Sequence, residues 1–115
     1  MELRKELKGF NIEDGERQMF NSIIEGMVDR NLSEIKGQNV ILHYTGDIDC
    51  IIPIENTHVA TVQCRDRRIH YIRLYSNDNE QEIDIDISKI NSIKNEIDMI
   101  NFHMQNDNLI TVDLQ

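Results

Sequence analysis

Apolar residues recur at helical spacing in the first third of the chain. They form one stripe, which consists of Met19, Phe20, Ile23, Ile24, Met27, Val28 and Leu32. Acidic residues where this segment begins and Arg30 near its end suit the helix dipole. The pattern predicts an amphipathic helix over about residues 12–31, capped by Asn11, after a shorter helix that contains Leu3 and Leu7 and ends at Gly9.

After Gly37 the apolar period changes to two, which is typical of strands with one buried face. The residues expected to point inward are Val40, Leu42, Tyr44, Ile48, Cys50, Ile52, Ile54, Ala60, Val62, Cys64, His70, Ile72, Leu74, Ile83, Ile85, Ile87, Ile100, Phe102, Met104, Ile110, Val112 and Leu114. Pro53 indicates an edge strand. We expect one α+β domain over residues 1–115. Its helical front end (1–37) should pack on an antiparallel sheet or small barrel of about six or seven strands (38–115).

The two cysteines, Cys50 and Cys64, are too few for a disulfide framework and lack the close spacing of metal ligands. Their strand parity predicts two small core residues in a reducing compartment. No apolar stretch approaches the roughly 18 residues that span a bilayer, and without an apolar segment near the charged N-terminus we expect no secretory leader. We therefore expect a cytoplasmic protein with no membrane partner.

No catalytic motif occurs in the chain: there is no phosphate-binding glycine loop, nucleophile elbow or His-Glu-x-x-His sequence. His58, Cys64 and His70 are evenly spaced and could converge on a metal, but their spacing matches no zinc pattern. The sequence therefore predicts a binding protein rather than an enzyme, with no catalytic residue, cofactor or metal.

The net charge of −9 lies almost entirely in the last third of the chain, where residues 77–115 carry nine acids and two lysines. Alternation places Glu82, Asp84 and Asp86 on one strand face, roughly 6.6 Å apart, after Asp78 and Glu80. Such a carboxylate row could occupy the Lys/Arg channel of a protein that grips nucleic acid. The alternative is a solvated face that prevents edge-to-edge aggregation.

A second surface is basic and aromatic. Four of the seven arginines fall within nine residues, and Tyr71, Arg73 and Tyr75 share one strand face. The predicted ligand-binding set is Arg65, Arg67, Arg68, Tyr71, Arg73 and Tyr75. Arginine beside tyrosine suits phosphate contact and base stacking. The alternative is a charged hairpin turn with tyrosines that cover the sheet.

Residues 39–93 resemble WYL-type and YolD-like small β-barrel domains, which have an SH3/Sm-like fold. The resemblance lies in Val40-Ile41-Leu42-His43-Tyr44, Pro53, His70-Tyr71-Ile72 and the segment from Ile85 to Ile93. It implies a regulator that senses a ligand or nucleic acid, with Arg68, Tyr71 and Arg73 near its ligand site. His70 stands where those domains have a tryptophan, and the hairpin 97–114 has no counterpart in them.

These observations favour a non-enzymatic acidic interaction protein whose partner is a basic, nucleic-acid-binding protein. A phage-type inhibitor, such as an anti-CRISPR or anti-restriction protein, has this size and charge, whereas direct nucleic-acid binding is disfavoured. Two alternatives stay open: a small-barrel regulator that binds a nucleotide or nucleic acid through the Arg/Tyr patch, and an immunity protein for a nuclease toxin. The helical stripe also leaves open a homodimer.

Overall fold

A long helix opens the part of the chain that the computed structural model describes, which is residues 12–115. Helix α2 spans Ile12–Leu32 and continues into a short 3-10 turn, η1 (Ser33–Ile35). This confirms the helix predicted from the apolar stripe. The shorter helix predicted around Leu3 and Leu7 and the cap at Asn11 lie outside the described residues.

Eight strands follow the helix, which confirms the predicted α+β class. They are β1 (Val40–Thr45), β2 (Cys50–Ile54), β3 (His58–Gln63), β4 (Ile69–Tyr75), β5 (Glu82–Asp86), β6 (Ile90–Glu96), β7 (Met99–Met104) and β8 (Leu109–Leu114). Two more 3-10 turns, η2 (Ile87–Lys89) and η3 (Gln105–Asp107), join β5 to β6 and β7 to β8. Strand β6 was not predicted from the sequence. Its register shifts between Ile90 and Ser92, so its half-buried residues Ile90 and Ile93 are three positions apart and do not show the two-residue alternation of a strand.

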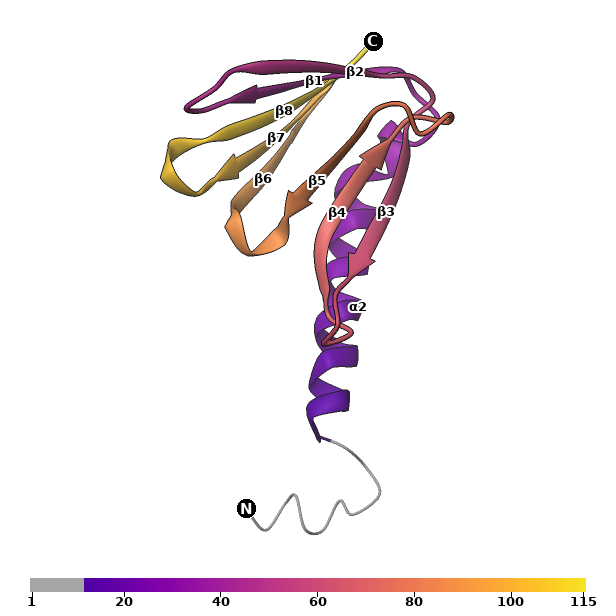
Figure 1. The fold of residues 1–115 in the computed structure, drawn as a ribbon, viewed down its shortest axis with the longest axis vertical. Helices are drawn as coiled ribbons and strands as arrows, with labels where there is room; N and C mark the ends of the chain where they lie inside the picture. Colours follow the sequence, from indigo (N-terminus) through magenta and orange to yellow (C-terminus); the bar gives the residue numbers. More distant parts are fainter. Residues whose placement is uncertain (1–11) are drawn as a thin grey trace.

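The strands form two antiparallel sheets rather than one closed barrel. A five-stranded sheet has the order β2-β1-β8-β7-β6, and a three-stranded sheet has the order β3-β4-β5. Pro53 lies on β2, an edge strand, as the sequence predicts. The β3-β4 hairpin runs alongside α2, and the five-stranded sheet fans out beyond the C-terminal end of the helix (Figure 1).

One apolar core joins α2 and both sheets, and the side chains of Leu32, Leu42, Ile72 and Phe102 in it are fully buried. The link between helix and sheet is held by Thr57, whose hydroxyl and amide both donate to the carbonyl of Gln38 at 2.7 and 2.9 Å. Within residues 12–115 no helix is long and apolar enough to cross a membrane.

The helical stripe is narrower than the sequence predicts. Ile24 and Val28 enter the core, whereas the residues Met19 and Ile23 are 67% and 60% exposed. The β3-β4 hairpin covers only one side of the helix, and Asn21 fixes it there. The Asn21 amide donates to the carbonyl of Arg67 and accepts from the amide of Ile69, each at 2.9 Å.

The predicted burial of both cysteines is wrong, because Cys50 and Cys64 are exposed. Val59 and Thr61 pair with the buried residues Leu74 and Ile72, so Ala60 and Val62 lie on the other face. A bulge between Val62 and Gln63 then ends the alternation, and Cys64 falls in the turn beyond β3.

The same bulge corrects the predicted position of His70. Val62 pairs with Tyr71 and Gln63 with Ile69, so the register skips His70. Ile69 therefore enters the core, while the side chain of His70 stays 40% exposed.

Candidate functional site

The two surfaces predicted from the sequence adjoin each other in the structure. Residues paired directly across antiparallel strands share a sheet face. The register therefore places three groups of side chains on one side of the three-stranded sheet, which we call the outer face: His58, Ala60 and Val62 from β3; Tyr71, Arg73 and Tyr75 from β4; and Glu82, Asp84 and Asp86 from β5. The opposite side carries Ile72, Leu74 and Ile85, which are buried.

Arg73 occupies the middle of the outer face and joins its basic and acidic rows. Its guanidinium donates two hydrogen bonds to Asp84, from Nε at 2.8 Å and from Nη2 at 3.0 Å, and Nε lies 3.1 Å from Glu82. The hydrogen bond to Asp84 is the main cause of the raised pKa of Arg73. Arg73 is therefore held within its own chain and does not project as an unpaired cation.

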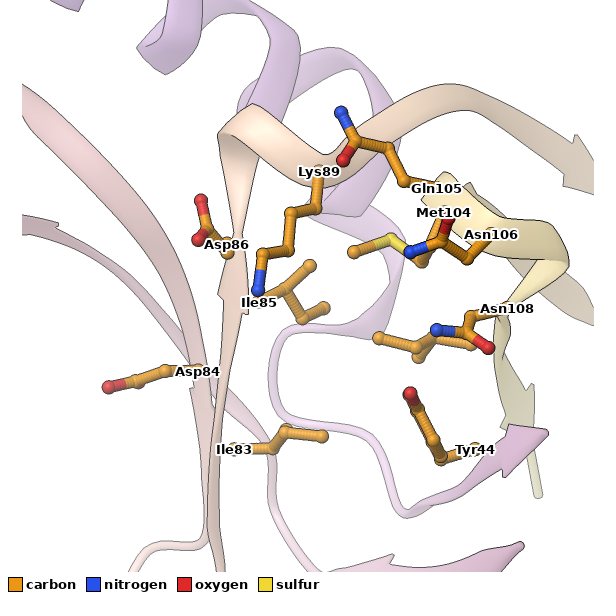
Figure 2. A pocket seen from close by; sticks show the side chains of 11 residues that line it. Tyr44, Ile83, Asp84, Ile85, Asp86, Lys89, Met104, Gln105, Asn106 and Asn108 are labelled. Carbon is orange, nitrogen blue, oxygen red and sulfur yellow. The ribbon is translucent and has the colours of Figure 1, made fainter. Parts of the chain in front are cut away.

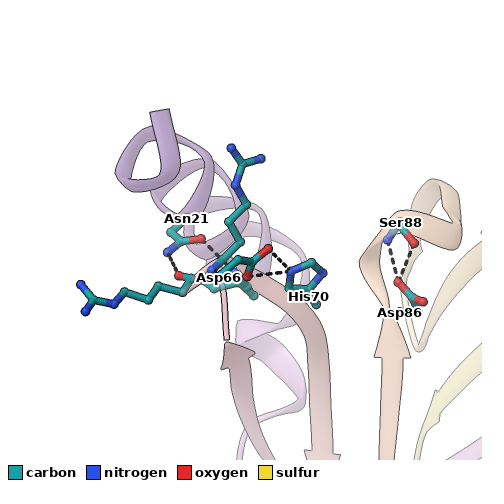
Figure 3. Close-up of polar contacts among 8 residues, drawn as sticks. Asn21, Asp66, His70, Asp86 and Ser88 are labelled. Atoms are coloured by element: carbon teal, nitrogen blue, oxygen red, sulfur yellow. Dashed lines mark hydrogen bonds and ion pairs between the residues drawn. The ribbon is translucent and has the colours of Figure 1, made fainter. Parts of the chain in front are cut away.

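The carboxylate row is aligned as predicted, but it is not left unpaired. Asp84 receives both bonds of the Arg73 fork. Oδ1 of Asp86 accepts hydrogen bonds from the amide and the hydroxyl of Ser88, at 3.0 and 2.7 Å (Figure 3). These contacts correct the expectation of a bare row, because an internal arginine and a turn already use part of its hydrogen-bonding capacity.

The two acids that precede the row behave differently from each other. Asp78 accepts from the Ser76 hydroxyl at 2.6 Å and from the Glu80 amide at 3.1 Å, and these bonds lower the pKa of Asp78. Asp78 thus organises the β4-β5 turn. Glu80, by contrast, is exposed beside it, and no ion pair of its side chain occurs within residues 12–115.

Aromatic side chains flank Arg73 along β4. At one end, Tyr75 stacks on His58 with ring centroids 5.1 Å apart, and His58 Nε2 contacts Asn77 Oδ1 at 3.0 Å. At the other end, Tyr71 is half-buried opposite Asp86. Because sequence analysis placed β3 in the wrong parity, it missed His58 as part of this face.

The remaining predicted arginines lie apart from the outer face, at the β3-β4 turn. There Asp66 accepts from the Arg68 amide at 2.9 Å and contacts His70 Nε2 at 2.8 Å (Figure 3). The Arg68 bond, followed by the His70 bond, lowers the pKa of Asp66. The guanidinium of Arg68 lies 5.6 Å from the centre of the Phe20 ring on α2.

The predicted Arg/Tyr set is thus divided between two places. Arg65, Arg67 and Arg68 belong to the turn, whereas Tyr75 lies at the far end of β4, roughly 20 Å along the strand. His58 and His70 are separated in the same way, at opposite ends of the hairpin. Within the described chain, no three His, Cys, Asp or Glu side chains group in a way that could hold a metal ion.

No family model matches the chain, and comparisons with curated proteins and with solved structures find no match either. The resemblance to WYL-type and YolD-like domains therefore stays a prediction.

Proposed function

We propose that this chain is a non-enzymatic binding protein whose outer face holds a Lys- or Arg-containing segment of a partner protein. The observation that carries the proposal is the composition of this face. Two tyrosines flank one arginine, and three carboxylates border them. Tyrosine and arginine are enriched among the residues that dominate protein interfaces.

Charge favours a cationic partner. Arg73 contacts Glu82 and Asp84 but brings one positive charge against the three β5 carboxylates, and the exposed Glu80 lies in the turn that leads into this strand. Asp86 keeps its second oxygen, because both bonds from Ser88 go to Oδ1. Tyr71, and the face of Tyr75 that is not stacked on His58, add ring faces on which a lysine or arginine of the partner can lie.

Proteins that bind nucleic acid do so through surfaces rich in lysine and arginine. We therefore propose, more specifically, a phage-type inhibitor of a nucleic-acid-binding protein. We place its action in the cytoplasm, because two exposed free thiols stay reduced there. The nucleotide-binding alternative has weaker support, because Arg73 is committed to Asp84 and Glu82 and the other arginines lie at the turn.

The test is selection of random peptides displayed against the folded protein, with binding compared at low and high salt. We expect the selected peptides to be rich in lysine and arginine. The double variant Glu82→Gln/Asp86→Asn should weaken the best peptide by at least about tenfold. Its charge-matched control is Glu96→Gln/Asp98→Asn, in and beside the turn between β6 and β7, which should bind as the unchanged protein does.

Equal losses in the two double variants would overturn the proposal, because they would indicate only a net-charge effect. So would peptides without cationic enrichment. Tight binding of a labelled oligonucleotide, abolished by Arg65→Gln/Arg67→Gln, would instead establish the nucleic-acid alternative.

A further inference from the structure

A pocket of about 290 Å³ lies where the two sheets fail to close into a barrel. One wall is β5, the unpaired edge of the three-stranded sheet, and consecutive residues 83–86 line the pocket along that edge. The opposite wall comes from the ends of β1, β7 and β8 and from η3. Its volume is close to the lower limit of small-molecule sites, roughly 300 Å³.

The interior of this pocket is apolar. Ile83 and Ile85 contribute from β5, and Met104 and Ile110 from the five-stranded sheet. Ile85 and Ile110 are among the buried core residues. The pocket therefore reaches the covered apolar layer between the sheets, where an apolar ligand body would be removed from water.

Polar groups gather around this interior. Figure 2 shows Tyr44 with its hydroxyl directed toward Asn108, and Lys89 extending from η2 alongside Ile85. Both side chains approach Gly46 closely, because a Cβ at this position would lie 2.6 Å from Asn108 Oδ1 and 2.9 Å from the Tyr44 ring. The hydroxyl and the carboxamide thus lie near each other, across the apolar interior from the lysine.

The sign of the charge in the pocket decides the class of ligand. Asp84 and Asp86 line it too, but their side chains lie on the outer face, opposite to Ile83 and Ile85, and Asp84 is ion-paired with Arg73. The Lys89 ammonium makes no ion pair or hydrogen bond with any residue from 12 to 115. Lys89 therefore supplies a positive charge beside the apolar interior, with no carboxylate of residues 12–115 in contact with it.

The geometry points to a binding site for a small organic anion, with its carboxylate or phosphate at Lys89, its body over Ile83, Ile85 and Ile110, and a polar substituent at Tyr44 and Asn108. A lysine ammonium binds either kind of anion as a point charge. Asp84 and Asp86 border both sites, but the side chains that would hold the anion are not those proposed to hold the partner, so this inference can stand if the proposed partner binding fails.

The test uses protein with labelled isoleucine methyl groups and follows them by NMR. The probes are phenylacetate, phenyl phosphate and the neutral phenylacetamide. We expect the methyl signals of Ile83, Ile85 and Ile110 to shift when at least one of the two anions is added. The affinity for that anion, obtained from the titration, should be about tenfold higher than the affinity for the amide. The stronger of the two anions identifies which acidic group the site prefers.

The variant Lys89→Met should remove this preference for the anion and leave amide binding unchanged. The control Lys94→Met changes an exposed lysine that is paired with Glu96 and should have no effect. Three results would overturn the inference: equal affinity for anion and amide, equal shifts at the exposed residues Ile48 and Ile97, or no shift of the pocket methyl signals with either anion.

Discussion

Arg73 on β4 lies directly opposite Asp84 on β5, and its guanidinium contacts both oxygens of that carboxylate, at 2.8 and 3.0 Å. This fork joins two surfaces that look separate in the sequence. It leaves a face on which tyrosines and carboxylates surround an internally paired arginine. Such a face suits a cationic protein segment better than a phosphate, because its central cation is already occupied.

Replacing Asn21 with alanine should destabilise the protein by about 1–3 kcal/mol, because the part-buried amide of Ile69 and the exposed carbonyl of Arg67 would both lose their partner. Urea unfolding followed by circular dichroism measures this change. The control is Gln18→Ala on an exposed position of the same helix, which should stay within about 0.5 kcal/mol of the parent. Equal stability of the two variants would show that Asn21 does not hold the hairpin.

Both thiols should react with a disulfide reagent in the folded protein, because Cys50 and Cys64 are exposed. The measurement is a thiol count without denaturant, and we expect the same value as in denaturant. Serine at either position should change the free energy of unfolding by less than about 0.5 kcal/mol. A thiol that reacts only after unfolding would place that cysteine in the core and contradict the register of β2 or β3.

Acid should loosen the two turns at the ends of β4 before it unfolds the core. The pKa values of Asp66 and Asp78 are lowered in the fold by hydrogen bonds to their carboxylates. Their stabilisation is therefore fully present above the unfolded value of about 3.9 and is lost as the pH falls through the lowered folded values.

Amide hydrogen exchange at Arg68 and Glu80 reports these turns directly, because their N–H groups donate to the two carboxylates. We expect protection to be constant from neutral pH down to about 5, after correction for intrinsic exchange, and to fall below about 4. Protection that falls together with the core amides, or does not fall at all, would contradict this assignment.

Sequence patterns located most of the fold because its signals are local. The four-residue recurrence around Ile24 and Val28 marks the helix, and the alternation around Phe102 and Val112 marks two central strands. The sequence patterns did not reveal the β-bulges. A single inserted residue reverses parity, so the shift after Val62 misplaced His70, and the shift after Ile90 hid β6. Cys64 was misplaced because all of β3 has the parity opposite to the one predicted.

The candidate site was predictable as two rows but not as one face. Alternation alone aligns Tyr71 with Arg73 and Glu82 with Asp84. That Arg73 pairs with Asp84, however, depends on the register between β4 and β5, which is set by a turn and by tertiary packing. The pocket beside Lys89 was beyond prediction for the same reason, because its walls come from strands far apart in the sequence.

The most direct test of the account is the affinity of the variant Arg73→Gln for an oligolysine peptide, measured by calorimetry at low salt. Loss of Arg73 releases Glu82 and Asp84, so binding should tighten several-fold. Arg65→Gln makes the same charge change at the β3-β4 turn without releasing either carboxylate, and it should tighten binding much less. Equal affinities of the two variants, or weaker binding by Arg73→Gln, would contradict a cation-binding outer face.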